Sequence, residues 1–226
     1  YTFPVDTVGN LGTSNNVIDR LLEDKQGNWW LGTLYAGLDY YDRTKGIFTH
    51  YKPNPTDPHS ILGESVWSLF QDSQENIWIG TRGGGLNLWD EANKGFIHYK
   101  HDKKVPASLS NDIINAVFED SKGNLWLGTN NGLNLFHPVS KNFTHYFLKD
   151  GLPSDAIQSI LEDGQGNLWL GTNNGLSCFN PVTKAFRNYE LNDGLQGSVF
   201  NSGAALKTTQ GEMYFGGTNG FNVFHP

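Results

Sequence analysis

The stretch Glu119-Asp120-Ser121-Lys122-Gly123-Asn124-Leu125-Trp126-Leu127-Gly128-Thr129 decides the fold, because closely similar stretches recur along the chain. Further copies begin at Glu23, Gln71 and Glu162, and a degraded fifth copy begins at Thr208. The aromatic residues at the equivalent position follow one another at spacings of 48, 48, 43 and 45: Trp30, Trp78, Trp126, Trp169 and Tyr214. Self-similarity at this spacing indicates a repeat architecture, in which every copy folds into the same small unit.

Each copy predicts four short strands. An apolar strand runs into Glu-Asp, and a turn of the form Asp-x-x-Gly-Asn leads into the second strand, which carries the repeated Trp. Asp can accept turn amide hydrogens, while Gly and Asn tolerate positive φ. A Gly-Leu pair opens the third strand, and the fourth carries a Phe and a Tyr, such as Phe143 and Tyr146. A four-stranded meander of this length is one blade of a β-propeller.

The predicted fold is therefore all-β: a single β-propeller domain over residues 1–226 with five four-stranded blades. The blades are expected at about 17–52, 65–100, 113–147, 156–190 and 201–226. The last copy stops after its third strand, whereas residues 1–5 resemble the tail of a fourth strand, with Tyr1 in the place of Tyr51. We expect the N-terminal strand to complete the last blade. The alternative is that the chain is a five-blade piece of a seven- or eight-bladed ring.

Composition limits the function. The 226 residues include 27 Gly and 13% aromatics, and the net charge is −7. A negative chain is a poor partner for nucleic acid, whose binding depends on clustered Lys and Arg. No apolar stretch is long enough to span a membrane. The single Cys178 excludes an internal disulfide, and the start at Tyr1 indicates a processed or excised chain.

The repeats resemble the two-component regulator propeller family, found in periplasmic sensor regions of bacterial hybrid histidine kinases. The resemblance spans essentially the whole chain. It is carried by Glu-Asp-x-x-Gly-Asn-Leu-Trp-Leu-Gly-Thr-Asn-Asn-Gly-Leu in the third and fourth copies, and by the connectors at 53–60 and 149–154. The stretch 194–224 is similar to the last repeat before the sandwich domain of such sensors. The resemblance implies a periplasmic or other extracytoplasmic ligand-sensing module, often for carbohydrates.

Ligand-binding residues are expected where repeat-equivalent positions differ, because positions that are alike in every copy serve the shared fold. One such position lies near the start of each first strand. It holds Asp19, Trp67, Asn115, Gln158 and Gly203. The following residue is small in most copies but is Arg20 in the first, where Asp19 or a ligand carboxylate would serve as its partner.

The loop between the second and third strands differs in the same way. It holds Tyr35 in the first copy, Arg82 in the second, and Asn pairs in the third and fourth: Asn130 and Asn131, Asn173 and Asn174. In a propeller this loop lies at the same end of the blade as the start of the first strand. Stacking on Trp67 and Tyr35, with hydrogen bonds from Arg82 and the amides, would suit a neutral or acidic sugar. For the Asn pairs, turn chemistry before Gly is the simpler interpretation.

No catalytic residue, cofactor or metal site is predicted. The repeated turn Asp has a structural role, because one active site does not need a copy in every blade. His50, His98 and His145 occupy the same place on three outer strands, so they cannot converge on one metal. No Ser-His-Asp set or phosphate-binding loop is present.

The preferred interpretation is a non-enzymatic ligand-sensing module of a two-component-type regulator. Its expected partners are an oligosaccharide or other small ligand, and neighbouring signalling domains or a second propeller. Two alternatives are open. One is a propeller enzyme similar to streptogramin lyases, which would need a His or an acid that its repeat equivalents lack. The other is a structural or designed scaffold without a small-molecule role.

Overall fold

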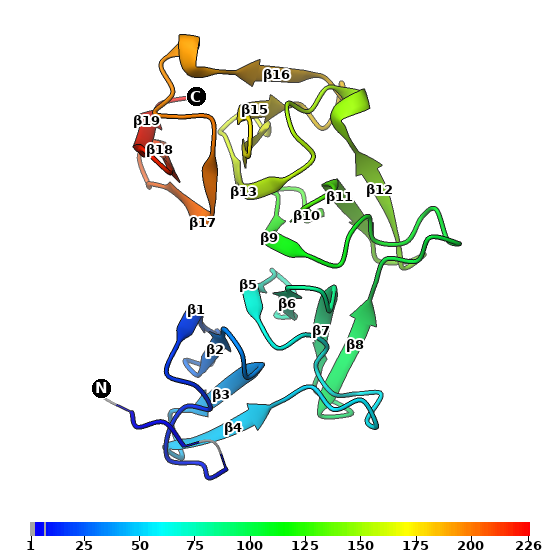
Figure 1. Ribbon diagram of the computed structural model, residues 1–226, viewed down its shortest axis with the longest axis vertical. Coiled ribbons are helices and arrows are strands. Elements are labelled where there is room, and N and C mark those ends of the chain that lie inside the picture. Colours follow the sequence, from blue (N-terminus) through cyan, green and yellow to red (C-terminus); the bar gives the residue numbers. More distant parts are fainter. Residues whose placement is uncertain (1–2, 7) are drawn as a thin grey trace. The chain divides into compact units, whose positions relative to one another are not determined.

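The computed structural model describes residues 3–6 and 8–226, and its regular structure is almost entirely β-strand (Figure 1). The described residues form five sheets, and in each of them the strands are ordered as they follow in the sequence. This confirms the predicted all-β fold built from five β-propeller blades. The chain divides into two compact units. Unit one contains the residues up to His101 and Asp112–Ile114, and unit two contains Asp102–Asn111 and Asn115–Pro226.

Unit one contains the first two blades. The strands of blade one are β1 (Ile18–Glu23), β2 (Trp29–Thr33), β3 (Leu38–Asp42) and β4 (Ile47–Tyr51). The strands of blade two are β5 (Val66–Gln71), β6 (Ile77–Thr81), β7 (Leu86–Asp90) and β8 (Gly95–Tyr99). Trp30, Leu38 and Phe96 belong to one buried cluster, so the two blades share a core.

Unit two contains the other three blades, apart from the first residue of β9. Blade three consists of β9 (Ile114–Glu119), β10 (Leu125–Thr129), β11 (Gly132–His137) and β12 (Asn142–Tyr146). Blade four consists of β13 (Ile157–Glu162), β14 (Leu168–Thr172), β15 (Gly175–Phe179) and β16 (Phe186–Tyr189). Blade five has three strands, β17 (Phe200–Lys207), β18 (Met213–Gly217) and β19 (Gly220–Phe224). Two short 3-10 helices, Leu148–Asp150 and Leu191–Asp193, lie in the connectors. In Figure 1, β9, β13 and β17 lie along one side of unit two, and β12 and β16 lie along the opposite side.

The repeated Asp ties the first turn of a blade to its Trp. In blade three, Asp120 Oδ1 accepts hydrogen bonds from the backbone N–H groups of Lys122 and Asn124, while Oδ2 accepts one from Trp126 Nε1 at 2.8 Å. Burial by itself would raise the pKa of Asp120, but these hydrogen bonds outweigh it and the pKa is lowered. Gly123 adopts φ 80° in the same turn. The predicted turn role of the repeated Asp is therefore what the geometry shows.

The Gly two residues after each repeated Trp is required by packing between blades. A Cβ on Gly128 would lie 2.8 Å from Ile157 Cγ2, and one on Gly32 would lie 2.7 Å from Val66 Cγ1. Ile157 and Val66 open the first strand of the following blade, and both are fully buried. Gly is thus needed here for close approach of the next strand rather than for a turn.

The N-terminal residues that the structure describes pack on blade one, whereas the expectation assigned them to blade five. Among the described residues β19 pairs only with β18, and Val5 forms a bridge with Thr13. Phe3 instead packs on blade one, with its ring centroid 4.9 Å from Tyr41 and 5.0 Å from Phe48. Tyr1, which the sequence comparison aligned with Tyr51, lies outside the described residues.

Phe3 packs against blade one in the way that Tyr51, the last aromatic residue of β4, packs against blade two. The rings of Phe3 and Tyr41 are 4.9 Å apart at 57°, and those of Tyr51 and Trp89 have the same separation and angle. An aromatic residue of the N-terminal segment therefore fills such a place, but it does so on blade one and the residue is Phe3. The reason is that Tyr41 and Phe48 offer aromatic faces there, against which Phe3 gains burial.

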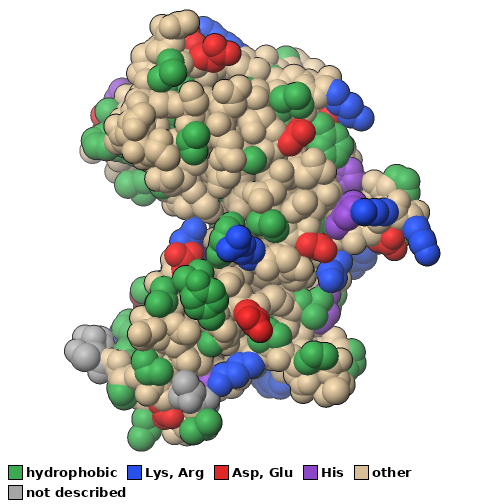
Figure 2. Space-filling model, in the orientation of Figure 1, with side chains coloured by type: hydrophobic (Ala, Val, Ile, Leu, Met, Phe, Trp, Pro, Cys, Tyr) green, Lys and Arg blue, Asp and Glu red, His purple; other side chains and the backbone are tan. Residues whose placement is uncertain are grey.

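Acidic and basic side chains are interspersed on the face shown in Figure 2. None of the helices in the described part of the chain has the length and apolar character that a membrane span requires.

Candidate functional site

In blades one, two and four, the differing position at the start of the first strand is the site of a β-bulge. In blade one the pairing steps from Ile18–Thr33 to Arg20–Gly32, which leaves Asp19 without a partner on β2. The same step leaves out Trp67 in blade two and Gln158 in blade four. A bulge re-aims the side chain of the extra residue. The side chain at this position is therefore not constrained by a partner on the second strand, which allows it to differ among blades.

The bulge residue contacts the first residue of the loop between the second and third strands, 15 residues further along. In blade three, Asn115 Nδ2 donates to Asn130 Oδ1 at 2.9 Å, and in blade four Gln158 Nε2 donates to Asn173 Oδ1 at 2.9 Å. In blade two, the guanidinium carbon of Arg82 lies 5.0 Å from the centre of the Trp67 ring, which is a cation–π contact. The structure thus joins six of the predicted site residues into three pairs. We call them the bulge–loop pairs.

The corresponding position of blade one has no such pair. Arg20 Nη1 binds Asp19 Oδ2 at 3.0 Å and the Asp19 carbonyl oxygen at 2.8 Å. Of the two partners considered for Arg20, the structure provides Asp19. Tyr35 lies in the adjoining loop and is 67% exposed.

The remaining predicted residues have polar atoms engaged within the protein. Asn131 N–H donates to Thr129 Oγ1, and its side chain donates to the Ser110 carbonyl oxygen at 3.4 Å. Asn174 repeats this arrangement one blade later, with its side chain on the Pro153 carbonyl oxygen at 3.2 Å. Both residues tie their loop to the preceding connector, as turn chemistry predicts.

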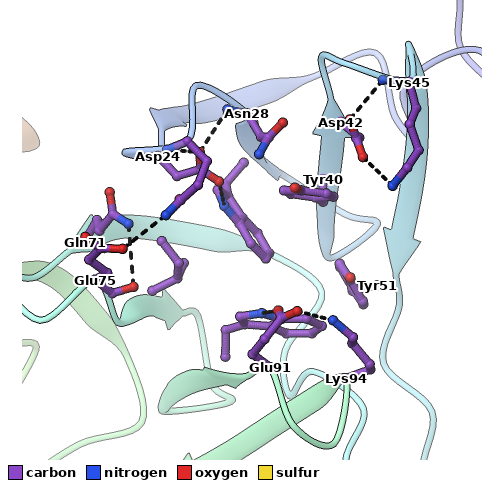
Figure 3. Close-up of a pocket in the computed structure, with 14 residues that line it drawn as sticks. Asp24, Asn28, Tyr40, Asp42, Lys45, Tyr51, Gln71, Glu75, Glu91 and Lys94 are labelled. Atoms are coloured by element: carbon purple, nitrogen blue, oxygen red, sulfur yellow. Dashed lines mark hydrogen bonds and ion pairs between the residues drawn. The ribbon is translucent and has the colours of Figure 1, made fainter.

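A cavity of about 520 Å³ lies at the other end of blades one and two, where sequence reasoning placed no site (Figure 3). It is formed within unit one by the turns between β1 and β2, between β3 and β4, and their counterparts in blade two. Four aromatic residues line it: Trp30, Tyr40, Tyr51 and Trp89. Four carboxylates and two lysines also line it: Asp24, Asp42, Glu75, Glu91, Lys45 and Lys94. We call this space the interblade cavity.

The aromatic residues form one continuous wall. The ring centroids of Trp30 and Tyr40 are 4.7 Å apart, those of Trp30 and Trp89 are 5.5 Å apart, and those of Tyr51 and Trp89 are 4.9 Å apart. Because the rings touch one another, they hold a fixed surface before any ligand arrives.

Charged and amide groups surround this wall. Lys45 Nζ contacts Asp42 Oδ2 at 2.8 Å, and Gln26 Nε2 donates to Glu75 Oε2 at 3.0 Å. Glu91 accepts from Lys94 Nζ and, at 2.9 Å, from Trp89 Nε1. The hydrogen bond from Lys94 and that from Trp89 lower the pKa of Glu91, so the group is ionised at neutral pH.

The two tyrosine hydroxyls of the cavity remain protonated. Burial, followed by the neighbouring carboxylates Asp24 and Asp42, raises the pKa of Tyr40 to about 12. Burial, followed by Glu91, raises the pKa of Tyr51 to about 12. Both hydroxyls can therefore donate hydrogen bonds at any physiological pH.

The repeat comparison could have revealed this cavity had it been applied to both ends of the blades. At the matching junction of blades three and four, Leu135 stands where Tyr40 stands, and Phe179 stands where Trp89 stands. Phe179 is fully buried and Trp126 is 1% exposed, so that junction is closed by apolar packing. Pro181 replaces Glu91 there. The polar and aromatic residues of the cavity thus differ from their equivalents in other blades, as the candidate residues at the loop end do.

The three equivalent histidines, His50, His98 and His145, each contact a separate partner. His98 Nε2 contacts the Ser60 carbonyl oxygen at 2.9 Å, and His145 Nε2 contacts that of Ser108 at 2.7 Å. His50 uses Nδ1 on Asp39 Oδ1 at 2.7 Å. Across the described residues, no three His, Cys, Asp or Glu side chains are grouped so that they could hold a metal ion.

Several solved structures are similar to this chain in fold. The extracellular domain of a hybrid two-component system from B. thetaiotaomicron is 27% identical, with a TM-score of 0.67, and the match covers 94% of this chain and 34% of that one. The chain thus spans about a third of the length of that domain. No curated protein matches the chain in sequence.

Two more distant structures share the fold alone. PorZ of Porphyromonas gingivalis, a surface component of the type-IX secretion system, is 14% identical with a TM-score of 0.67, and the match covers 92% of this chain and 32% of PorZ. Virginiamycin B lyase from Staphylococcus aureus is 14% identical with a TM-score of 0.64, and the match covers 100% of this chain and 72% of the lyase.

A family model described as "two component regulator propeller" matches four segments of the chain, 12–35, 60–83, 108–131 and 151–174. Each segment contains the connector end, the first strand, the Asp turn and the Trp strand of one blade. These are the elements whose contacts define the blade. The chain therefore carries four two-component regulator propeller repeats, one in each of its first four blades.

Proposed function

We propose that the chain is the ligand-binding part of an extracytoplasmic, periplasmic sensor of the two-component type, and that its ligand is a carbohydrate bound in the interblade cavity. The repeats and the 27% identity to an extracellular domain of a hybrid two-component system support the sensor role. The interblade cavity supports the ligand class. The role is one of binding rather than catalysis.

The observation that carries the proposal is the combination of a continuous aromatic wall with a mixed polar rim. Sugar rings present apolar C–H faces that pack on aromatic rings, and their hydroxyls both donate and accept hydrogen bonds. The rim offers donors such as Lys45 and acceptors such as Asp42 and Glu75 within one cavity. A volume of about 520 Å³ lies in the range of small-molecule sites.

The cavity is built from two blades, so a bound ligand would bridge them. Trp30, Tyr40 and Tyr51 belong to blade one, whereas Trp89 and Glu91 lie on β7 and just after it in blade two. A ligand that contacts both walls stabilises their contact by an amount that rises with the ratio of its free concentration to its dissociation constant. Neighbouring signalling domains or a second propeller would respond to this change in the contact between the two blades.

Substitution by repeat-equivalent residues tests the proposal with little risk to the fold. Tyr40→Leu and Trp89→Phe install the residues that blade three and blade four carry at the same positions. Trp67→Asn and Arg82→Asn do the same for the bulge–loop pair of blade two. Wild type is first screened by thermal shift and calorimetry against a panel of neutral and acidic oligosaccharides.

We expect an oligosaccharide of the panel to bind wild type and to lose at least tenfold in affinity with Tyr40→Leu and Trp89→Phe combined. Stacking alone is worth about 0.5–1.5 kcal/mol per aromatic contact, and lost burial adds to it. The Trp67→Asn and Arg82→Asn variant should bind normally. No binding by any panel member would overturn the carbohydrate proposal, and loss only in the bulge–loop variant would move the site to the other end.

A further inference from the structure

We propose that the interblade cavity selects uncharged saccharides and rejects those that carry a carboxylate or sulfate group. This inference rests on the proposed carbohydrate function and narrows the ligand class. The sequence alone allowed a neutral or an acidic sugar, and it placed that sugar at the opposite end of the blades.

The charges of the cavity lining argue against an anionic ligand. Four carboxylates and two lysines line the cavity, and Lys25, which lies outside the lining, pairs with Glu75 at 3.5 Å, so one negative charge is left in excess. Both lysines already have a carboxylate partner, Asp42 for Lys45 and Glu91 for Lys94, so neither adds an uncompensated positive charge to the cavity. An anionic ligand would meet each lysine only beside the carboxylate that the lysine already neutralises.

The other hydrogen-bonding groups of the lining are neutral. Among the described residues, the hydroxyls of Tyr40 and Tyr51 have no hydrogen-bond partner, yet both line the cavity beside the aromatic wall (Figure 3). Burial, followed by the nearby carboxylates, raises the pKa of each phenol to about 12, so both stay protonated. Unpaired neutral donors beside paired charges match hydroxyl groups rather than anions.

The negative lining is specific to this junction. Where blade two has Glu91 and Glu75, blade four has Pro181 and Gly166. The shared turn and strand geometry therefore does not require these carboxylates. Glu91 is held in place by Trp89 Nε1 at 2.9 Å, which fixes a negative charge at the edge of the aromatic wall.

The size of the expected discrimination follows from Coulomb's law. One uncompensated carboxylate about 4 Å from a ligand anion weakens binding by about fivefold in water, and by more where solvent is excluded. Since the excess is one charge, we expect the acidic form of a ligand to bind about fivefold or more weakly than the neutral form at low ionic strength. Added salt should reduce the ratio.

The test compares matched ligands on matched variants. The neutral oligosaccharide that binds wild type is compared by calorimetry with its derivative in which one primary alcohol is oxidised to a carboxylate. The readout is the ratio of the two dissociation constants, acidic over neutral. It is measured in wild type, in Glu91→Gln and in Glu64→Gln. Glu64 is an exposed connector residue of unit one outside the cavity lining, so it controls for net charge.

We expect the ratio to be about five or more in wild type and Glu64→Gln, and to fall towards one in Glu91→Gln, where Lys94 loses its partner. Acidic and neutral ligands of equal affinity in wild type would overturn the inference while leaving carbohydrate binding intact. An equal fall in Glu64→Gln would also overturn it, because the effect would then come from net charge. If no neutral saccharide binds, the proposed function itself fails, so the two failures are distinct.

Discussion

Gly128→Ala tests whether the repeated Gly holds the blades together, and its cost can be worked out from the structure. The new methyl carbon would lie 2.8 Å from Ile157 Cγ2 and 3.1 Å from Ile157 Cβ. Ile157 is fully buried at the start of β13, so its side chain has no open space to move into. Overpacking of a buried contact costs about 1–3 kcal/mol. We expect the free energy of unfolding to fall by that amount.

The assay is urea denaturation followed by Trp fluorescence, with Gly164→Ala as the matched control. Gly164 lies in the Asp turn of blade four and does not have a positive φ, and a Cβ added to it would meet no atom within 4 Å. Ala at Gly164 should therefore be neutral, or stabilise by about 0.4–1 kcal/mol through the unfolded chain. The difference between the two Ala variants isolates the contact with the next blade.

A double-mutant cycle identifies the partner. Ile157→Ala alone should cost about 2–5 kcal/mol, because it leaves a cavity in a closed core. Combined with Gly128→Ala, it should cost at least about 0.5 kcal/mol less than the sum, since the new methyl then fills vacated space. Additive costs would show that Ile157 is not the source of the strain. A Gly128→Ala variant as stable as Gly164→Ala would refute the packing role of this Gly.

Four further outcomes are expected. Trp126→Ala should lower the free energy of unfolding by about 3–5 kcal/mol in denaturation, because Trp126 is 1% exposed and bonded to Asp120; an unchanged melting temperature would contradict its place in the core. Asp120 has a lowered pKa in the folded protein, so its stabilisation is present above the unfolded pKa of about 4 and is lost as pH falls through the folded pKa; Asp120→Ala should flatten the acid limb of a stability–pH curve. Tyr40 and Tyr51, whose pKa values are raised to about 12, should ionise later than exposed phenols in an absorbance titration at alkaline pH, and Tyr40→Leu should remove part of that late step. Asp39→Asn should change stability in urea denaturation by less than about 1 kcal/mol, because Asn fills this buried position in blades two and three and can still accept the Ser14 N–H.

Much of the fold was predictable because its signals are local. The Asp turn of blade three lies within a few residues of Trp126, and the atoms that Asp120 binds are all in that turn and strand. Five copies of the pattern then predict five blades. The candidate site was predictable only in part. The variable positions were identified, but the pairing of Trp67 with Arg82 depends on a bulge in the register between β5 and β6.

The sequence by itself determined the blade: its strands, its turn and the Trp that anchors them, because each of these depends on neighbours along the chain. The tertiary structure decided what the blades make together. Phe3 packs on blade one, and Trp30 meets Trp89 across a junction to enclose the interblade cavity. These contacts join residues that are far apart in the sequence, and the approach of one blade to the next depends on the Gly positions. The separation between neighbouring blades is set by the packing of whole sheets, so it cannot be inferred from a single stretch of the sequence.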